Sequence, residues 1–394
     1  MNITHLLASD LKSISAGGIA SYVRGLIRAH RKSGLNLSFV GVTGDREDSI
    51  DMWAKKSIDA EELMFLPVAY TAEKHLTYAK GVPLNAIFLL KLFINRKNIV
   101  FASGLLHIHR FEAAIPFLLF KKNIKIVLTI HGLSRAIEQA KSHPFYSKKW
   151  FKRLYYIAEK FVLHRVDKVI LVSQEGMDYY VQKYSDYKEK FILIPTFVDT
   201  SLFSIENKKI ELRKRYKLSP DGKIILFAGR FDYLKGLDLL IESFQKLRQE
   251  VRDSTLLLVG DGREKNGLKK KVLDLGIEGV EFRDMVSHDE LPQIMNCADI
   301  YALTSLWEGM PLVALEAMAC GIPVVSTDVG QLGEIVKDGS TGYLVAARSA
   351  AEFALKMRLC MDGAPSMTSS CRAMAEKYSL PVIADRILTV YREI

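Results

Sequence analysis

The sequence has 394 residues, which is longer than one typical domain and predicts two. Its net charge of +10 is uneven: residues 1–200 carry 29 Lys and Arg against 18 Asp and Glu, whereas residues 201–394 carry 26 against 27. No apolar run reaches membrane-spanning length, no signal peptide is expected, and the four cysteines lack C-x-x-C spacing, which fits a reducing cytoplasm without a zinc site or disulfides. The basic first half indicates an anionic partner, namely a phosphate-bearing substrate or an acidic lipid surface. No nucleic-acid-binding motif is present, so nucleic acid is not expected as a partner.

The first elements predict a βαβ opening, with a strand from Ile3 to Ser9, a helix over about 19–33 and a strand from Leu35 to Val42. Gly17 and Gly18 precede this helix, where a backbone without side chains allows close approach of a phosphate or a sugar. Two glycines that only form a turn explain the pattern equally well. The spacing is not the G-x-G-x-x-G of dinucleotide sites.

Residues 45–80 are polar and give no clear element. Beyond them, the pattern predicts a helix, a strand, a second helix and a second strand over 83–95, 105–109, 111–122 and 124–130. The last strand ends at His131, and the tip of a strand in an α/β sheet is where ligands usually bind. A surface histidine remains the alternative interpretation.

Aromatic and aliphatic residues recur at helical spacing between residues 144 and 165, with Lys and Arg filling much of the rest. The earlier part, 144–156, is a candidate helix lying on an anionic membrane surface. A helix packed on the core with a solvated basic face is the alternative. The later part leads into a strand from Val169 to Ser173 and reads as ordinary core.

The second half repeats the same alternation after a polar linker with a short helix over 200–222. Strands are expected at 223–228, 255–259, 280–282, 299–304, 323–327 and 343–345, with helices between them and a final helix over 380–394. The chain therefore predicts an α/β fold of two Rossmann-like domains. A cleft between the two domains is the default binding site.

One carboxylate stands on a helix that is otherwise apolar on nearly all sides. This is Glu316, in the run Leu312–Ala319, which has no Lys or Arg to pair it. Glu308 lies before the helix, near its N-terminal N–H groups, and Pro311 suits the first helical turn. An unpaired buried acid is costly unless something hydrogen-bonds to it, so these acids favour a ligand site over a structural glutamate.

Two cations, Arg230 and Lys235, follow the strand that ends at residue 228 and precede the next helix. Together with helix N–H groups they suit a diphosphate, although surface cations on a loop are the plainer explanation. The sequence contains no D-x-D, which removes the simplest carboxylate pair for Mg²⁺, and no P-loop motif. We therefore expect neither a metal nor a cofactor.

The second half resembles the retaining glycosyltransferases of family 4, which have the GT-B fold. The resemblance rests on two glutamates seven residues apart and on the segments around them: 227–230, 235–236, 258–262, 308–312, 315–319, 321–325, 338–339 and 341–342. The first half matches more loosely, at residues 17–18, 131–132 and 172–173. The resemblance implies an acceptor domain over 1–199, a donor domain over 200–379, and a terminal helix over 380–394 that crosses back to the first domain.

The resemblance also implies roles for the candidate residues. Glu316 would bind the ribose hydroxyls of a nucleotide-diphosphate sugar, and Arg230 with Lys235 would hold its diphosphate. His131 and Glu308 would orient the transferred sugar. The remaining donor contacts would come from Gly17, Gly18, Gly309, Met310, Pro311 and Leu312.

The resulting prediction is a retaining, metal-independent glycosyltransferase that acts on a glycan or lipid-linked acceptor in cell-surface polysaccharide or lipopolysaccharide biosynthesis. The protein would be cytoplasmic and peripheral on the inner face of the cell membrane. Two alternatives stay open: a nucleotide-sugar epimerase of the same fold, and a catalytically silent scaffold within a glycan-assembly complex. Met310 and Pro311 stand where the family often has Phe-Gly, which leaves the donor sugar open.

Overall fold

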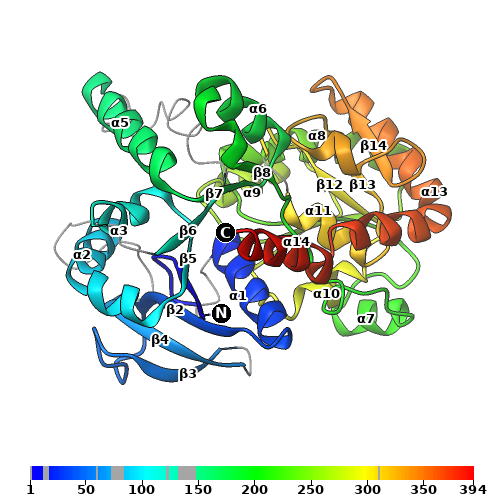
Figure 1. Ribbon diagram of the computed structural model, residues 1–394. Helices are drawn as coiled ribbons and strands as arrows, with labels where there is room; N and C mark the ends of the chain where they lie inside the picture. Colours follow the sequence, from blue (N-terminus) through cyan, green and yellow to red (C-terminus); the bar gives the residue numbers. More distant parts are fainter. Residues whose placement is uncertain are drawn as a thin grey trace. The chain divides into compact units, whose positions relative to one another are not determined.

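The computed structural model describes residues 2–11, 17–58, 61–71, 84–120, 124–131, 148–308 and 311–394 (Figure 1). The chain divides into two compact units, Met1–Thr196 with Leu380–Ile394, and Phe197–Ser379. We call these the first and the second unit. Each is built on one parallel or largely parallel sheet with helices packed on it, which confirms the predicted fold class of two Rossmann-like domains.

The sheet of the first unit has eight strands in the order β3-β4-β2-β1-β5-β6-β7-β8. All neighbours are parallel except β3 and β4. Central strands of this kind read as unbroken apolar runs because both faces of the sheet are covered, and β5 is buried at every residue. The strands are β1 Asn2–Leu6, β2 Asn36–Thr43, β3 Ala54–Ile58, β4 Glu61–Tyr70, β5 Leu105–Ile108, β6 Lys125–Ile130, β7 Lys168–Leu171 and β8 Phe191–Leu193.

Helices pack on this sheet, and the last helix of the chain is one of them. In α14 the backbone carbonyl of Ala384 lies 2.8 Å from Nε2 of His30 on α1, so the C-terminal segment packs on the first helix of the same unit. Within the described ranges, the helices of the first unit are α1 Gly17–Lys32, α2 Leu84–Ala102, η1 Phe111–Ala114, α3 Ile115–Leu118, α5 Lys149–Arg165, α6 Gln174–Lys183, η2 Ser185–Lys190 and α14 Leu380–Arg392.

Two sequence-based assignments in this unit need correction. The region 45–80, for which the sequence pattern predicted no element, contains β3 and the ten-residue β4. The pairing of β4 with β3 ends at Phe65, so the missing N–H of Pro67 in β4 breaks no hydrogen bond to β3. The single helix expected over 111–122 is instead the 3₁₀ turn η1 followed by α3, because Pro116 stands at a helix start where its missing N–H costs nothing.

The sheet of the second unit has six parallel strands in the order β11-β10-β9-β12-β13-β14. The chain leaves β9 toward β10 and β11, and then returns to the other side of β9 with β12. This reversal next to β9 is the place where open α/β sheets bind ligands, at the carboxyl ends of the strands. The strands are β9 Lys223–Ala228, β10 Ser254–Val259, β11 Val280–Arg283, β12 Ile300–Leu303, β13 Val324–Thr327 and β14 Gly342–Val345.

The helices of the second unit bury one continuous apolar core with this sheet. Its longest helix, α13, has 28 residues and was not anticipated, because Gly363 and Pro365 interrupt the helical pattern in the sequence. The helices are α7 Lys209–Arg215, η3 Tyr233–Lys235, α8 Leu237–Glu250, α9 Lys265–Asp274, α10 Leu291–Met295, α11 Leu312–Ala319, α12 Leu332–Ile335 and α13 Ala350–Lys377.

Candidate functional site

Two residues that the sequence places far apart form an ion pair at the carboxyl edge of the second sheet. Nζ of Lys235 lies 2.6 Å from Oε1 of Glu308, and the two side chains are 22% and 10% exposed. The hydroxyl of Ser305 donates a second hydrogen bond, of 2.6 Å, to the same carboxylate oxygen. Lys235 therefore already has an anionic partner before any phosphate binds.

The loops that carry this pair are bonded to each other. The hydroxyl of Thr304 donates to the carbonyl oxygen of Lys235 at 3.1 Å, and the N–H of Leu306 donates to the carbonyl oxygen of Leu234 at 2.7 Å. Gly236, between η3 and α8, has a φ of +57°, and a Cβ on it would lie 2.4 Å from the carbonyl oxygen of Thr304. Only glycine fits this left-handed position, so Gly236 sets how closely the two loops approach.

Arg230 lies apart from this pair. Its side chain is 78% exposed, and its guanidinium lies 3.3 Å from the carboxylate of Asp232. Within the described part of the chain, no hydrogen bond or ion pair joins Arg230 to Lys235 or Glu308. The structure thus brings together Lys235 and Glu308 and places Arg230 apart from them, exposed and paired with Asp232.

The backbone around Arg230 is nevertheless fixed. The N–H of Gly229 donates to Val259 at 2.9 Å, and the N–H of Phe231 donates to Asp261 at 2.8 Å. A Cβ on Gly260 would lie 1.9 Å from the carbonyl oxygen of Gly229. The glycine-rich loop after β10 therefore holds the segment that carries Arg230, while the arginine side chain is exposed to solvent.

Glu316 lies on α11 with only 7% of its surface exposed, among buried apolar neighbours. Within the described ranges, no side chain or backbone group donates a hydrogen bond to its carboxylate. Burial raises the pKa of Glu316 from 4.5 to about 8, since nothing in this apolar surrounding stabilises the charged form. The sequence-based expectation of an unpaired carboxylate on a buried helix is confirmed.

The remaining donor residues of this unit lie at the start of α11. Pro311 is the N-cap residue and Leu312 is the first helical residue, so the helix begins one residue after the proline that was expected in its first turn. Gly309 and Met310 fall outside the described residues. Two residues of this site, Ser305 and Arg348, were not predicted from the sequence. Arg348 donates from Nη1 to the carbonyl oxygen of Thr304 at 2.9 Å, and because it lies 44 residues downstream the sequence gives no signal of this contact.

In the first unit, His131 follows the last residue of β6 and is partly buried. Its Nε2 lies 3.3 Å from Nδ1 of His109, and its ring packs edge-on against Tyr22 with centroids 4.9 Å apart. Burial lowers the pKa of His131 to about 4, so this side chain is neutral at physiological pH. Gly17 and Gly18 are the first two residues of α1.

Comparisons with known proteins agree over both units. A family model described as Glycosyltransferase Family 4 matches residues 16–202, and one described as Glycosyl transferases group 1 matches residues 208–378. The alpha-D-kanosaminyltransferase of Streptomyces kanamyceticus is 26% identical over 369 residues, which cover 86% of this chain and 89% of that protein. The D-inositol 3-phosphate glycosyltransferase of Streptomyces bingchenggensis is 30% identical over 250 residues, and the match spans about half of that protein, 55%, and 60% of this chain.

Solved structures resemble the whole chain. Sucrose-phosphate synthase from Thermosynechococcus elongatus matches with a TM-score of 0.77 at 22% identity and covers 100% of this chain and 98% of its own. HepE of Anabaena in complex with UDP-glucose gives 0.73 at 20% identity, covering 100% of both chains. WaaG, a glycosyltransferase involved in lipopolysaccharide biosynthesis, gives 0.72 at 15% identity, covering 98% of this chain and 99% of its own. The two family models and these folds show that the chain belongs to the family 4-type glycosyltransferases, with the GT-B fold.

Proposed function

We propose that this protein transfers a sugar from a nucleotide-diphosphate sugar to a glycan or lipid-linked acceptor, with retention of the anomeric configuration. The assignment of a nucleotide sugar as substrate rests on the burial of Glu316. Within the described residues, no group donates a hydrogen bond to its carboxylate. A buried carboxylate needs such donors, and the two hydroxyls of a ribose supply them. Glu316 would therefore bind the ribose of the donor nucleotide.

The diphosphate would be held by Lys235 and Arg230. A cation and a phosphate about 4 Å apart attract by on the order of 4 kcal/mol at an effective dielectric of about 20, before desolvation. Because Lys235 is already paired with Glu308, diphosphate binding would redistribute its hydrogen bonds between two anions. Arg230, exposed on a fixed backbone, would close onto the diphosphate from solvent.

In the second unit Glu308 would orient the transferred sugar, and His131 of the first unit is proposed as a separate contact of that sugar. Gly17, Gly18 and the segment 309–312 would complete the donor contacts by allowing the backbone to approach closely. None of these residues is assigned as a covalent nucleophile. A bond would form between the acceptor oxygen and the anomeric carbon on the face that the phosphate leaves, and the departing phosphate oxygen would take the acceptor's proton.

Relatives support this proposal without fixing the substrate. HepE has been solved with UDP-glucose, and WaaG is involved in lipopolysaccharide biosynthesis. The HepE complex supports a nucleotide sugar as donor, and WaaG supports a cell-surface polysaccharide or lipopolysaccharide as product.

We also propose that transfer needs no metal, because the sequence has no D-x-D pair and two cations can neutralise the diphosphate. Activity that persists after treatment with EDTA is the expected result.

Helix α5 is the proposed contact with the membrane that carries the acceptor. On α5 three large apolar side chains point into solvent, with exposed fractions of 58% for Trp150, 57% for Leu154 and 58% for Ile157. Exposed basic residues flank them, including Lys149 and Arg153. Such a face fits the headgroup region of an anionic bilayer, so the protein would act in the cytoplasm, peripherally on the inner face of the cell membrane.

The candidate membrane segment 144–156 is described only from residue 148 onward. None of the helices in the described ranges combines the length and the apolar character needed to cross a bilayer.

The experiment that tests the function is transfer with purified protein. UDP-, GDP-, ADP- and TDP-sugars are screened by thermal shift, since a bound ligand raises stability, and the stabilising donor is then offered to candidate acceptors. The proposal expects transfer with retained configuration and loss of donor binding in Glu316→Ala. A product formed from the donor alone would indicate epimerisation, and the absence of any nucleotide binding would support a silent scaffold.

A further inference from the structure

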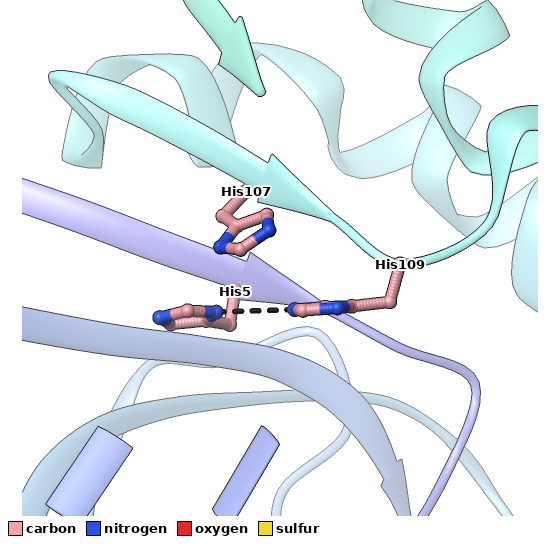
Figure 2. Close-up of side chains that lie close together, drawn as sticks. All are labelled: His5, His107 and His109. Carbon is pink, nitrogen blue, oxygen red and sulfur yellow. Dashed lines mark hydrogen bonds between the residues drawn. The ribbon is translucent and has the colours of Figure 1, made fainter. Parts of the chain in front are cut away.

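Four histidines of the first unit follow one another across a single face of its sheet, and Figure 2 shows three of them. His5 on β1 is paired in register with His107 on β5, and His109 stands just past the end of β5. His131 stands just past the end of β6.

His5, His107 and His109 are 0%, 0% and 1% exposed. Burial lowers the pKa of His5 to about 3 and holds the pKa values of His107 and His109 well below 6.5, so all four rings are neutral near pH 7.

Three of these rings form a chain of nitrogen–nitrogen contacts. Nδ1 of His5 lies 3.2 Å from Nε2 of His109, and Nδ1 of His109 lies 3.3 Å from Nε2 of His131 (the first of these is the dashed line in Figure 2). His109 is therefore bonded at both ring nitrogens and forms the middle of the chain. His107 takes no part in it, because its Nδ1 lies 2.5 Å from the hydroxyl of Tyr391 and its Nε2 lies 2.7 Å from that of Thr129.

A neutral imidazole has one N–H donor and one bare acceptor nitrogen, so a chain of such rings must donate in one direction throughout. The buried Nε2 of His5 has no hydrogen-bond partner among the described residues. If the chain donated toward His5, this orphan atom would carry a hydrogen. A buried N–H without an acceptor is rarer in proteins than an under-satisfied acceptor, which favours donation from His5 through His109 to His131.

We propose that His109 is a positioning residue that holds His131 as the tautomer with hydrogen on Nδ1, so that His131 presents a hydrogen-bond donor to the donor sugar. The hydrogen on Nδ1 of His5 points to His109, and the hydrogen on Nδ1 of His109 points to Nε2 of His131. Among the contacts of the described residues, Nε2 of His131 is occupied by His109, and Nδ1 then remains to meet a ligand, as N–H. The inference rests on the proposed function for the identity of that ligand.

A metal site is the competing explanation of the same cluster. One nitrogen each from His5, His107 and His109 lie within 4.8 Å of one another, which is compatible with three ligands of one ion. Both nitrogens of His107 are already bonded to Tyr391 and Thr129, however, so an ion would have to displace one of these bonds. The contacts therefore favour the hydrogen-bonded chain.

The test uses two variants of His109 in the full-length protein. The side-chain amide of asparagine takes the place of Nδ1, and that of glutamine takes the place of Nε2. His109→Asn therefore keeps the bond to His131, whereas His109→Gln keeps only the bond to His5. Ring ¹⁵N spectra of His131 report the tautomer: we expect a protonated Nδ1 and a bare Nε2 in wild type and His109→Asn, and a mixture of tautomers in His109→Gln.

Kinetics provide the second readout. His109→Asn should retain most of the wild-type kcat, whereas His109→Gln should lose about tenfold or more, with a smaller change in the donor KM. Asparagine leaves the larger void, so thermal stability should fall further in His109→Asn, opposite to the order of activity. A structural role alone would make activity follow stability.

Three results would overturn the proposal. The first is a wild-type His131 with hydrogen on Nε2 or with mixed tautomers, and the second is equal kcat in the two variants. The third is stoichiometric binding of Zn²⁺ by EDTA-treated protein with metal-type ¹⁵N shifts at His5 and His109. If wild type transfers no sugar at all, the proposed function fails, whereas the spectra still decide the tautomer of His131.

Discussion

Lys235 and Glu308 form an ion pair of 2.6 Å across 73 residues of sequence, at the edge of the sheet where the candidate donor site lies. The pair joins the loop after β9 to the loop after β12. Ser305 and Arg348 support it, the first by donating to Glu308 and the second by donating to the backbone of Thr304. The charge available to a diphosphate therefore depends on both partners and not on the lysine alone.

Lys235→Ala should lower kcat/KM by about 100-fold or more, because a cation aimed at the departing diphosphate is lost. It also leaves Glu308 as an uncompensated, 10% exposed carboxylate that repels the phosphates. The affinity for the donor's nucleoside diphosphate (UDP, if the screen selects a UDP-sugar) should fall in parallel, measured by calorimetry. Lys246→Ala, at an exposed lysine of α8, is the matched control and should behave as wild type. Equal UDP affinity in the two variants would contradict the diphosphate assignment.

Glu308→Gln should separate binding from chemistry. Without the carboxylate, Lys235 is released toward the diphosphate, so UDP should bind a few-fold more tightly than in wild type. The kcat should fall, because the group proposed to orient the sugar is replaced. Calorimetry with UDP and initial rates with the donor sugar measure the two effects. A weaker UDP affinity together with unchanged kcat would show that the ion pair only supports the fold.

Glu316→Gln should make the ligand-free protein more stable at alkaline pH. The pKa of this carboxyl is raised from 4.5 to about 8, so the folded state binds more protons than the unfolded state between these values. Stability is therefore fully present below about pH 4.5 and is lost as the pH rises toward 8, by at most about 1.4 kcal/mol per pH unit. Glutamine removes this dependence, while nucleotide affinity should fall.

Thermal unfolding across this pH range measures the effect, with Glu264→Gln, at an exposed glutamate of the same unit, as the control. Wild type and Glu316→Gln should coincide at low pH and diverge as the pH rises. Parallel curves for both proteins would mean that Glu316 is already ionised and partnered in the folded state.

The buried histidines predict loss of stability on the acid side. The pKa of His5 is lowered from 6.5 to about 3 and that of His131 to about 4, so the unfolded state binds more protons below pH 6.5. Stability is present above that pH and is lost as the pH falls, by up to about 1.4 kcal/mol per unit for each neutral ring. Urea midpoints should drop steeply below pH 6.5. The slope should become shallower in His5→Phe and stay unchanged in His164→Gln, an exposed position.

Gly236→Ala should destabilise the second unit and weaken donor binding, because its φ of +57° and the 2.4 Å approach to Thr304 exclude a side chain. Gly267→Ala is the matched control: this glycine lies within α9 with no atom inside 4 Å of the added Cβ, so alanine should stabilise the helix by up to about 1 kcal/mol. Thermal unfolding and UDP titration distinguish the two. Similar behaviour of both variants would refute the close packing of the loops.

Membrane association should depend on the outer face of α5. Sedimentation with anionic vesicles should be strong at low salt and weak at high salt, and Trp150→Ser with Leu154→Ser should abolish it. Leu273→Ser removes an apolar side chain that is 79% exposed in the second unit and should leave binding unchanged. Binding that is insensitive to α5 or equal on uncharged vesicles would contradict the proposed surface.

Some predictions from sequence held because the signals are local. The buried helix around Glu316 and its start at Pro311 could be read from apolar spacing and one proline within a dozen residues. The strands in region 45–80 were not predicted from the sequence, because β4 takes its stability from pairing with β2 and β3 and not from its own pattern of apolar residues. The prediction of a single helix over 111–122 was wrong because Pro116 starts a new helical turn.

The sequence by itself determined the fold class, the family signature and which residue types stand at the ends of the strands, since helix and strand periods and turn chemistry are properties of neighbouring residues. Only the tertiary structure decided the partners of these residues. Lys235 meets Glu308, and His5 meets His109 across 104 residues, because register within a parallel sheet and the loops at its edge set these distances. The sequence predicted an unpaired Glu316 on a buried helix, but only the segments that enclose this helix in the folded protein raise the pKa of its carboxyl.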